Sequence, residues 1–476
     1  MHKPNDNLLN GELRRFKTYP TYKSSGVEWL GDIPAGWGVN RLKEVATIQM
    51  SNVDKKSVDG EDEVELCNYT DVYYHDRITP DMPFMKATAP REQVRRFALR
   101  AGDVLITKDS ESWTDIAVPA VVVADMPNVL CGYHLAHIRP KTAMDGAYLS
   151  RAIAAVGPRD QFRVAANGVT RFAIGTEAIT TAVFAVPPLS EQRAIAAFLD
   201  RETARIDALV SRKERLITLL QEQRTALITR AVTKCLNPTA PMKDSGVEWL
   251  GEIPAHWEDT RLRRVLTWIE QGWSPDCENR PADEDEWGVL KAGCVNRGEF
   301  VESEHKTLPQ SERPILELEI REGDLLMSRA SGSRDLVGSV AVVRKCRPRL
   351  LLCDKVFRLH VDERHVGKTF AAHALNSRVA RSQIESVLSG GSGLANNIAQ
   401  SVVKDLMIAL PPRDEQEEIT TFIDDETARL DGLIAHIRNA IVRLNELRTA
   451  LISAAVTGKI DVRYSTDPAT DADATA

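Results

Sequence analysis

Two stretches of the chain, residues 190–233 and 414–457, place apolar residues at alternating spacings of three and four. The first contains no Gly or Pro and the second only Gly432, so each stretch predicts a helix of up to 44 residues. The apolar positions are Ile195, Leu199, Ile206, Leu209, Leu216, Leu220 and Leu227 in the first stretch, and Ile419, Ile423, Leu430, Leu433, Ile437, Leu444, Leu447 and Leu451 in the second. Sustained over about five heptads, this pattern is typical of a coiled coil. Because an exposed seam of this length is costly, we expect the two helices to pair with each other; packing of each helix on its own domain is the alternative.

A long internal repeat divides the chain into two halves. Residues 25–37 (SGVEWLGDIPAGW) and 245–257 (SGVEWLGEIPAHW) are identical at eleven of 13 positions, 220 residues apart. A P-P-x-x-E-Q motif stands before each predicted helix, at 187–192 and at 411–416, and its Ser190 or Asp414 can cap the helix. Two copies of a duplicated unit can pack around a pseudo-two-fold axis, as identical subunits do, and such an axis makes the paired helices antiparallel.

Between the repeated segments, each half has a body whose sequence differs from that of the other half. Short apolar runs bounded by turn residues predict strands at 117–123 and 129–135, and at 324–328, 338–343 and 356–359, with helices at 147–155 and 366–377. The fold class that we predict is α+β, with two duplicated domains separated by two long antiparallel coiled-coil helices in a pseudo-two-fold arrangement. The expected segments are a first body at 22–189, a first long helix at 190–236, a second body at 242–413, a second long helix at 414–458 and a flexible tail at 459–476.

The overall charge limits what the chain can bind. Its formal net charge is −7, which argues against a uniformly basic surface that coats nucleic acid, so any DNA contact must come from local patches or from partners. The seven cysteines form no C-x-x-C pair, which argues against a zinc site or a disulfide framework. No run approaches the roughly 18 apolar residues of a membrane span, and residues 1–10 lack a signal core. We therefore expect a cytoplasmic protein without membrane association.

Motifs of common enzymes are absent from the sequence. Residues 367–369 (GKT) resemble the end of a phosphate-binding loop, but Asp362 stands where that loop requires its first glycine. The Gly-rich run 389–393 does not follow a strand in a dinucleotide-binding context. There is no H-E-x-x-H or G-x-S-x-G motif, and neither double proline belongs to the Asn-Pro-Pro-aromatic tetrapeptide of an amino-methyltransferase. We therefore expect no catalytic residue, no metal site and no cofactor in this chain.

Two variable bodies, each followed by a P-P-x-x-E-Q helix, resemble the specificity subunit of type I restriction-modification enzymes. The W-L-G-[DE]-I-P-x-x-W segments are similar to that family too, as are residues 271–275 (QGWSP) and 328–332 (SRASG), and the resemblance covers about 22–233 and 242–457. It implies that each body is a target recognition domain that reads one half of a split site in double-stranded DNA. The helices would set the spacer and dock two modification subunits, which methylate adenine N6 with S-adenosylmethionine. Restriction subunits that use ATP and Mg would join them.

Two polar loops in each body supply the side chains that base readout needs: Arg or Lys toward guanine, and Asn or Gln toward adenine. In the first body the candidates are Thr107, Lys108, Ser110, Ser112 and Trp113 in loop 107–115, and Asn167, Thr170 and Arg171 in loop 166–172. In the second body they are Ser328, Arg329, Ser331, Ser333 and Arg334, together with Asn396, Asn397 and Gln400 at the position that matches 166–172 in the repeat. We predict that these loops contact DNA; for any single residue, a solvated loop is the alternative.

Two other functions stay open at this point. A single-chain nuclease or methyltransferase with an unusual motif would cut or methylate DNA by itself. A coiled-coil scaffold whose duplicated bodies bind protein would show no sequence preference for DNA, even with modification subunits present.

Overall fold

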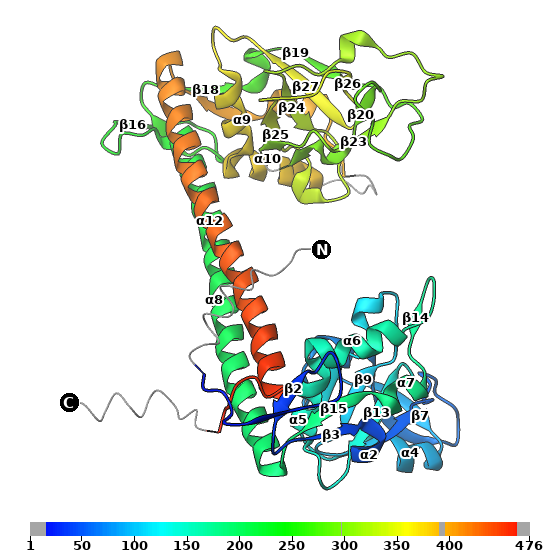
Figure 1. Cartoon of the computed structure of the whole chain (residues 1–476). Helices are drawn as coiled ribbons and strands as arrows, with labels where there is room; N and C mark the ends of the chain where they lie inside the picture. The colour runs from blue at the N-terminus through cyan, green and yellow to red at the C-terminus, as the bar shows by residue number, and fades with distance from the viewer. Residues whose placement is uncertain (1–15, 297, 390–395, 464–476) are drawn as a thin grey trace, which may run out of the picture. The chain divides into compact units, whose positions relative to one another are not determined.

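The computed structural model of the chain describes residues 16–296, 298–389 and 396–463 (Figure 1). The chain forms two compact units: unit 1 comprises Met1–Lys213 and Arg438–Ala476, and unit 2 comprises Glu214–Ile437. Each unit thus contains one of the variable bodies, one half of the first long helix and one half of the second. No helix among the described residues is long and apolar enough to cross a membrane.

Two sheets form the frame of unit 1, one with the strand order β4-β13-β9-β11-β6 and one with the order β7-β5-β12-β8. The pairs β11–β6 and β12–β5 are parallel, and the other neighbours are antiparallel. The strands are β1 (Tyr22–Ser24), β2 (Asp32–Pro34), β3 (Gly38–Arg41), β4 (Ala46–Met50), β5 (Asp62–Cys67), β6 (Arg77–Ile78), β7 (Met85–Ala89), β8 (Ala98–Leu99), β9 (Val104–Thr107), β10 (Asp109–Ser110), β11 (Pro119–Val122), β12 (Met126–Cys131), β13 (Leu135–Pro140), β14 (Phe172–Ala173) and β15 (Val183–Val186). The short helices are α2 (Leu42–Val45), α3 (Tyr69–Tyr74), α4 (Arg91–Phe97), η1 (Trp113–Asp115), α5 (Gly146–Ala154), α6 (Val156–Ala165) and α7 (Thr176–Thr181).

The core of unit 1 lies on both faces of β9, a strand that is buried along its whole length. Val104 and Ile106 face a cluster that includes α5 and the ends of the long helices, whereas Leu105 faces the cluster between the two sheets. Successive side chains of a strand point to opposite faces, so a continuous apolar run is the expected sequence of such a central strand.

Unit 2 repeats this plan with the orders β19-β27-β24-β25 and β23-β20-β26, and β20–β26 is again a parallel pair. Its strands are β16 (Met242–Asp244), β17 (Glu252–Pro254), β18 (Glu258–Arg261), β19 (Leu266–Gln271), β20 (Gly288–Leu290), β21 (Val295–Asn296), β22 (Glu299–Phe300), β23 (His305–Thr307), β24 (Leu325–Ser328), β25 (Val340–Val342), β26 (Leu350–Leu351), β27 (Val356–Val361) and β28 (Met407–Leu410). Its short helices are η2 (Leu262–Arg264), η3 (Ala292–Cys294), η4 (Leu316–Leu318), η5 (Arg334–Leu336), α9 (Lys368–Asn376), α10 (Arg378–Ser389) and α11 (Gln400–Asp405).

Most of the elements predicted in the bodies are present. β11, β24, β25 and β27 confirm four predicted strands, and α5 and α9 confirm both predicted helices. The prediction of one strand at 129–135 is wrong, because β12 ends at Cys131 and β13 begins at Leu135. The chain turns at Gly132, where a Cβ atom would lie 2.8 Å from the carbonyl oxygen of Cys67. The tight contact requires glycine at this turn.

The long helices are α8 (Leu189–Lys234) and α12 (Arg413–Val456), and they confirm the predicted helical stretches. Each begins one residue earlier than predicted, so Ser190 and Asp414 lie inside the first turn and do not cap it. The carbonyl of Pro188 accepts the N–H of Gln192 at 3.0 Å, which makes the second proline the start of the helix. A proline suits this position because the first N–H groups of a helix have no partner within it.

In each unit the two long helices run antiparallel. In unit 1, Ile195 and Leu199 near the start of α8 share a core with Leu451 near the end of α12. In unit 2, Ile419 near the start of α12 shares a core with Ile228 near the end of α8. The antiparallel pairing that the repeat predicts is therefore confirmed.

The helical seam differs by one residue from the predicted seam at several positions. Leu209 and Leu216 of α8 and Leu433 of α12 are 39%, 45% and 43% exposed. Their neighbours Val210, Ile217 and Ile434 are half-buried or buried instead. On α8 the covered positions are Thr203, Ile206, Val210, Lys213, Ile217, Leu220 and Arg224, a regular alternation of three and four. Lys213 therefore belongs to the seam, although it is absent from the predicted apolar positions.

The glutamine of each P-P-x-x-E-Q motif fastens a body to its long helix. Gln192 Oε1 accepts the N–H of Asp145 at 2.8 Å, and its Nε2 donates to the carbonyls of Ala143 and Pro187 at 3.0 and 2.9 Å. Gln416 makes the same three bonds with Gly367, His365 and Pro411, at 2.9, 2.8 and 2.8 Å. Both side chains are buried, so the motif forms a structural joint.

The start of the predicted flexible tail is packed. Ile460 and Val462 are buried in the core of unit 1, and the N–H of Asp461 donates to the carbonyl of Lys17 at 2.7 Å. The prediction is therefore wrong for residues 459–463, where apolar residues follow the end of α12. The rest of the predicted tail, 464–476, lies outside the described residues.

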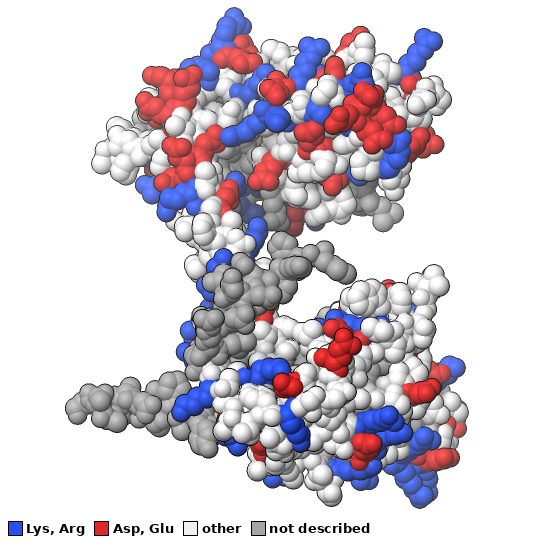
Figure 2. All heavy atoms as spheres, in the orientation of Figure 1, with Lys and Arg blue, Asp and Glu red and all other residues white. Residues whose placement is uncertain are grey.

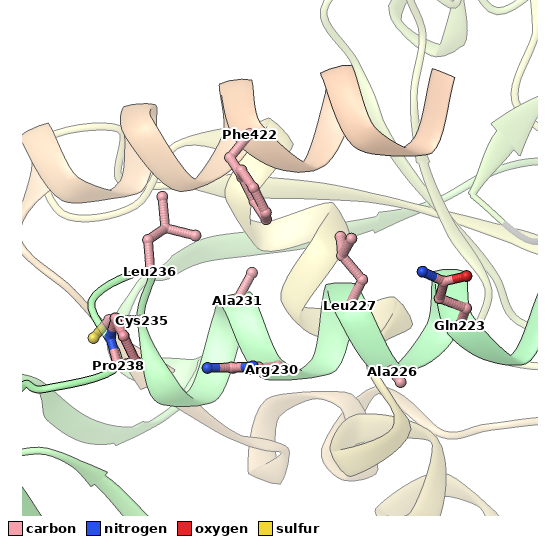
Figure 3. Close-up of a pocket in the computed structure, with 9 residues that line it drawn as sticks. All are labelled: Gln223, Ala226, Leu227, Arg230, Ala231, Cys235, Leu236, Pro238 and Phe422. Carbon is pink, nitrogen blue, oxygen red and sulfur yellow. The ribbon is translucent and has the colours of Figure 1, made fainter. Parts of the chain in front are cut away.

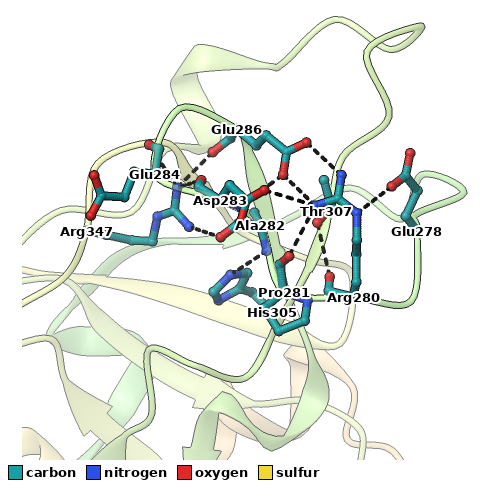
Figure 4. A network of polar contacts seen from close by, with 10 residues as sticks. All are labelled: Glu278, Arg280, Pro281, Ala282, Asp283, Glu284, Glu286, His305, Thr307 and Arg347. Carbon is teal, nitrogen blue, oxygen red and sulfur yellow. Dashed lines mark hydrogen bonds and ion pairs between the residues drawn. The ribbon is translucent and has the colours of Figure 1, made fainter.

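Two arginines fold a loop before β20 in unit 2 (Figure 4). Arg280 binds Glu286 with both terminal nitrogens at 2.6 Å and Glu278 through Nε at 2.8 Å. Arg347 donates to the carbonyls of Ala282 and Asp283, each at 2.6 Å. This loop is held by side chains of the second body, in the part of the chain where the two halves differ in sequence.

Candidate nucleic-acid interface

The two polar loops predicted in the first body lie together in unit 1. β10 pairs antiparallel with β14, and the N–H of Ile174 donates to the carbonyl of Lys108 at 2.9 Å. Loop 166–172 turns at Gly168, whose φ is +145° and where a Cβ atom would lie 1.9 Å from the carbonyl oxygen of Arg171. Loops 107–115 and 166–172 therefore form one surface.

Asp109, whose side chain is 12% exposed, connects cationic side chains of both loops. Its carboxylate accepts from Arg171 Nη2 at 2.6 Å and from Lys108 Nζ at 3.2 Å, and His134 Nδ1 lies 2.5 Å away. Burial raises the pKa of Asp109, but the hydrogen bond from Arg171 and the charges of His134 and Lys108 hold it below its usual value. Burial lowers the pKa of His134. An ionised carboxylate thus orients Arg171, whose side chain stays 55% exposed.

The other predicted residues of unit 1 differ in how much of each side chain solvent can reach. Asn167 and Thr170 are exposed, and Trp113 is 49% exposed with the Arg163 guanidinium 5.8 Å from its ring centroid. Lys108 and Ser112 are half-buried. Ser110 is buried, and its hydroxyl lies 3.0 Å from that of Tyr69.

Two predicted DNA contacts, Thr107 and Ser328, are wrong because both residues are fully buried. They end β9 and β24, which lie in the interior of their sheets. Thr107 Oγ1 donates to the carbonyl of Asp115 at 2.7 Å and accepts the N–H of Val118 at 2.9 Å. A hydroxyl at the end of a central strand thus supports the base of the loop and does not reach solvent.

Unit 2 has the same arrangement of backbone. The N–H of Ile398 donates to the carbonyl of Arg329 at 2.9 Å, and Ala330 forms an antiparallel bridge with Asn397. The N–H of Ser331 donates to the carbonyl of Asn396 at 3.2 Å. The two polar loops predicted in the second body therefore lie together, as their counterparts do in unit 1.

The side chains that unit 2 presents are different. Ala330 holds the place of Asp109, and Arg329 is half-buried, with Nη1 donating to the carbonyl of Asp354 at 3.0 Å and its guanidinium 5.8 Å from the ring centroid of Phe357. Ser333, Arg334 and Asn397 are exposed, whereas Ser331, Asn396 and Gln400 are half-buried. The same backbone frame thus carries two different sets of donors.

Several residues that we did not predict complete the surface of unit 1. Besides Asp109 and His134, α3 contributes Tyr69 and Tyr73, stacked with ring centroids 5.4 Å apart, and Tyr74, which is 73% exposed. The aromatic run of α3 is a signal that the sequence does carry. Asp109 and His134 have no such signal, because they are distant in sequence and meet only through the pairing of β9 with β13.

Positive charge near these loops is local. On the face drawn in Figure 2, Lys and Arg side chains are interspersed with Asp and Glu in both units. Lys108, Arg163 and Arg171 lie at the loops of unit 1, and Arg329 and Arg334 at those of unit 2. This distribution fits the overall charge of −7 and the expectation of patches.

Comparison with known proteins shows which proteins this chain resembles. A family model described as the type I restriction modification DNA specificity domain matches residues 34–218. The chain is 31% identical over 242 residues to the specificity subunit of the type I restriction enzyme EcoEI from Escherichia coli, covering 51% of this chain and 40% of that one. It is 26% identical over 286 residues to the specificity subunit of the type I restriction enzyme EcoKI from Escherichia coli strain K12, covering 59% and 58%. The chain thus spans about half the length of these two relatives.

A solved structure has a similar fold. It is described as the structural basis underlying complex assembly and conformational transition of the type I R-M system, and it superposes with a TM-score of 0.65 at 18% identity. The superposition covers 89% of this chain and 98% of that one. Residues 34–218 thus match the type I restriction modification DNA specificity domain, and the chain is similar to specificity subunits of type I restriction enzymes and shares the fold of the solved structure.

Proposed function

We propose that this chain is a non-catalytic reader of a two-part DNA sequence, in which each body recognises one half of the site. The observation that carries the proposal is the repeated frame of the loops. The bond from Ile174 to the Lys108 carbonyl recurs from Ile398 to the Arg329 carbonyl at the same 2.9 Å, while the side chains around it differ. A constant backbone with different donors suits two half-sites of different sequence.

Within unit 1, Arg171 is the strongest candidate for a base contact. Asp109 fixes its guanidinium, and Arg binds guanine through two parallel donors. Asn167, Thr170, Lys108, Ser112 and Trp113 would contact neighbouring bases or phosphates. Within unit 2, Asn397 offers an exposed amide suited to adenine and Arg334 an exposed guanidinium, with Ser331, Ser333, Asn396, Gln400 and Arg329 beside them.

The long helices would dock two modification subunits and set the spacer between the half-sites. Their outer faces carry apolar side chains that a partner can cover: Leu209 and Val442 in unit 1 are 39% and 55% exposed, and Leu216 and Leu433 in unit 2 are 45% and 43% exposed. In this proposal the modification subunits bind S-adenosylmethionine and methylate adenine N6, and restriction subunits bring ATP and Mg. The chain itself holds no cofactor.

The test exchanges the second body, residues 260–410, for that of a relative with another specificity. The modified complex should methylate a site in which one half has changed and the other half is the same. Methylation mapping on a whole genome reads this directly, and the unexchanged complex is the control. A change in both halves would refute independent reading by the two bodies.

The same preparations separate the alternative functions. Methyl transfer or cleavage by the purified chain alone would favour a single-chain enzyme. Loss of every sequence preference in the presence of modification subunits would favour a protein-binding scaffold.

A further inference from the structure

A groove in unit 2 lies between the end of α8, the segment that follows it, and the start of α12 (Figure 3). It encloses about 430 Å³. Phe422 projects from α12 toward α8, with Leu236 and Leu227 on either side of it. Phe422 is 39% exposed and Leu236 is 38% exposed, although both face apolar neighbours. The groove is thus an apolar surface that this chain leaves uncovered.

In unit 1 the corresponding groove is filled by the chain's own N-terminal segment. Phe198 holds the place of Phe422 in the repeat, yet it is only 3% exposed. Phe16 packs edge-on against it, with ring centroids 5.4 Å apart. The adjoining Lys17 carbonyl accepts the N–H of Asp461 at 2.7 Å, which fixes the segment beside the residues that follow α12.

The difference between the units follows from how the chain is connected. In unit 1 two segments meet at this place, the one that follows α12 and the one that precedes β1. In unit 2 a single segment runs directly from the end of α8 at Lys234 to the start of β16 at Met242. By the repeat, Leu236 holds the place of Phe16 at one offset and of Ile460 at the other, so one residue stands where unit 1 has two, and Phe422 stays 39% exposed.

The rim of the groove indicates what kind of segment would fill it. Glu418 and Asp425, one turn before and one turn after Phe422 on α12, are exposed, and Arg230 lines the α8 side. In unit 1 the place of Asp425 is taken by Arg201, which lies over the ring of Phe198 at 5.6 Å. The α12 side of the groove in unit 2 is therefore acidic, where unit 1 is basic.

We propose that this groove binds a peptide segment of a partner protein that carries an aromatic anchor flanked by basic residues. The aromatic ring would pack edge-on against Phe422 as Phe16 does against Phe198, and the basic residues would face Glu418 and Asp425. Edge-to-face aromatic pairs add to the burial of apolar area, and opposite charges at the rim favour one class of partner over others. This site is additional to the DNA-reading loops and does not depend on them.

The test uses a fluorescent peptide with the sequence of residues 13–19, LRRFKTY, because it contains the segment that fills the groove of unit 1. Binding to the purified full chain is measured by anisotropy without DNA or other subunits. We expect saturable binding that Phe422→Ala weakens by about tenfold or more. The matched control is Leu219→Ala, since Leu219 is 45% exposed on α8 of the same unit and lies outside the groove, and this variant should bind normally.

Three results would overturn the proposal. The first is no binding to the folded wild-type chain at millimolar peptide. The second is equal binding by Phe422→Ala, which would mean that the peptide exchanges with the resident segment in unit 1. The third is equal binding by a peptide whose Arg and Lys residues are replaced by Glu, which would refute the charge requirement. Because Phe422 is 39% exposed and outside the buried core, the Ala variant should stay folded, and its unfolding temperature, compared with that of the wild type, tests for misfolding.

Discussion

Arg448 of α12 places its Nε atom 3.1 Å from Oδ1 of Asp207 on α8, in unit 1. In unit 2 the same contact recurs with the helices exchanged, since Arg224 of α8 has its Nε atom 3.6 Å from Oδ1 of Asp431 on α12. Asp207 and Asp431 hold one place in the repeat, and Arg224 and Arg448 hold another. The pairing of the helices is thus reciprocal, as in an interface between two identical subunits.

These ion pairs should define the register of the helices without adding much stability. The side chain of Asp207 is 54% exposed, so a double-mutant cycle of Asp207→Ala and Arg448→Ala should give a coupling of about 0.5–1 kcal/mol. Ile206→Ala, one residue away but 6% exposed, should cost about 2–5 kcal/mol. Urea unfolding measures both. A coupling that exceeds the effect of Ile206→Ala would show that the charges dominate.

Acid should destabilise unit 1 through Asp103. Burial alone would raise the pKa of this carboxyl, but bonds from Arg139 and His137 lower it from 3.8 to about 2. A pKa that is lower in the folded chain gives stability that is present above pH 4 and is lost as the pH falls toward 2. The lost contribution is about 2 kcal/mol.

The comparison that isolates this effect is Asp103→Asn, which should flatten the fall in unfolding free energy between pH 4 and pH 2. Asp59→Asn, an exposed site in the same unit, should leave the fall unchanged. If Asp103→Asn kept the full acid dependence, the loss would have to arise at other carboxyls.

Arg171→Ala should relax base preference at one position of the half-site read by unit 1. The expected cost is roughly 1–3 kcal/mol at that base pair, the range for a bidentate contact. Asp109→Asn should act in the same direction, because it removes the negative charge that orients Arg171. Binding is compared across a set of sites that differ at single positions, in the complex with modification subunits.

Thr107→Val is the control for this series. It removes a buried hydroxyl with two partners and should lower stability by about 1–3 kcal/mol without changing base preference. A uniform loss of affinity in Arg171→Ala, whatever the base, would mark a phosphate contact instead of base readout.

Lengthening α8 should lengthen the DNA spacer. Four residues inserted after Leu220 add about 6 Å of helix, close to two base pairs at roughly 3.4 Å each. Four residues in a heptad seam also form a stutter, which local unwinding can absorb at some loss of stability. We expect unchanged half-sites and a spacer longer by about one or two base pairs.

Methylation mapping with modification subunits gives the length of the spacer, and an insertion near Gly60, in an exposed loop of unit 1, is the control. An active variant with its spacer unchanged would mean that partners position the bodies.

The register of the paired helices could not be predicted from the sequence alone. At Leu209–Val210, Leu216–Ile217 and Leu433–Ile434 two apolar residues are adjacent, so either can continue a heptad pattern. The true seam also contains Thr203, Lys213 and Arg224, whose polar ends conceal its regular spacing. The methylene groups of Lys and Arg side chains can cover a helix seam. A prediction based only on apolar residues misses such positions.

The candidate site was predictable as loops and not as individual side chains. The bond from Ile398 that repeats the bond from Ile174 gives an offset of 224, so residues 396–400 correspond to 172–176, and the predicted match with 166–172 is wrong by several residues. Residues 390–395, which correspond to 166–171, lie outside the described residues. Burial of Thr107 and Ser328 depends on which strands flank β9 and β24, and a local sequence pattern does not predict the order of strands in a sheet. The same holds for Asp109 and His134, which are brought together only by the sheet.

The joints at Gln192 and Gln416 bind the bodies through main-chain N–H and C=O groups of residues 143 and 145, and of residues 365 and 367. Every amino acid except proline offers these groups, so the joint places almost no constraint on the residues that it holds. A body from another gene could be inserted by recombination at these points and still be fastened in the same way. If each body reads DNA as proposed, the exchange of whole bodies would give new specificities without matched changes in the helices that carry them.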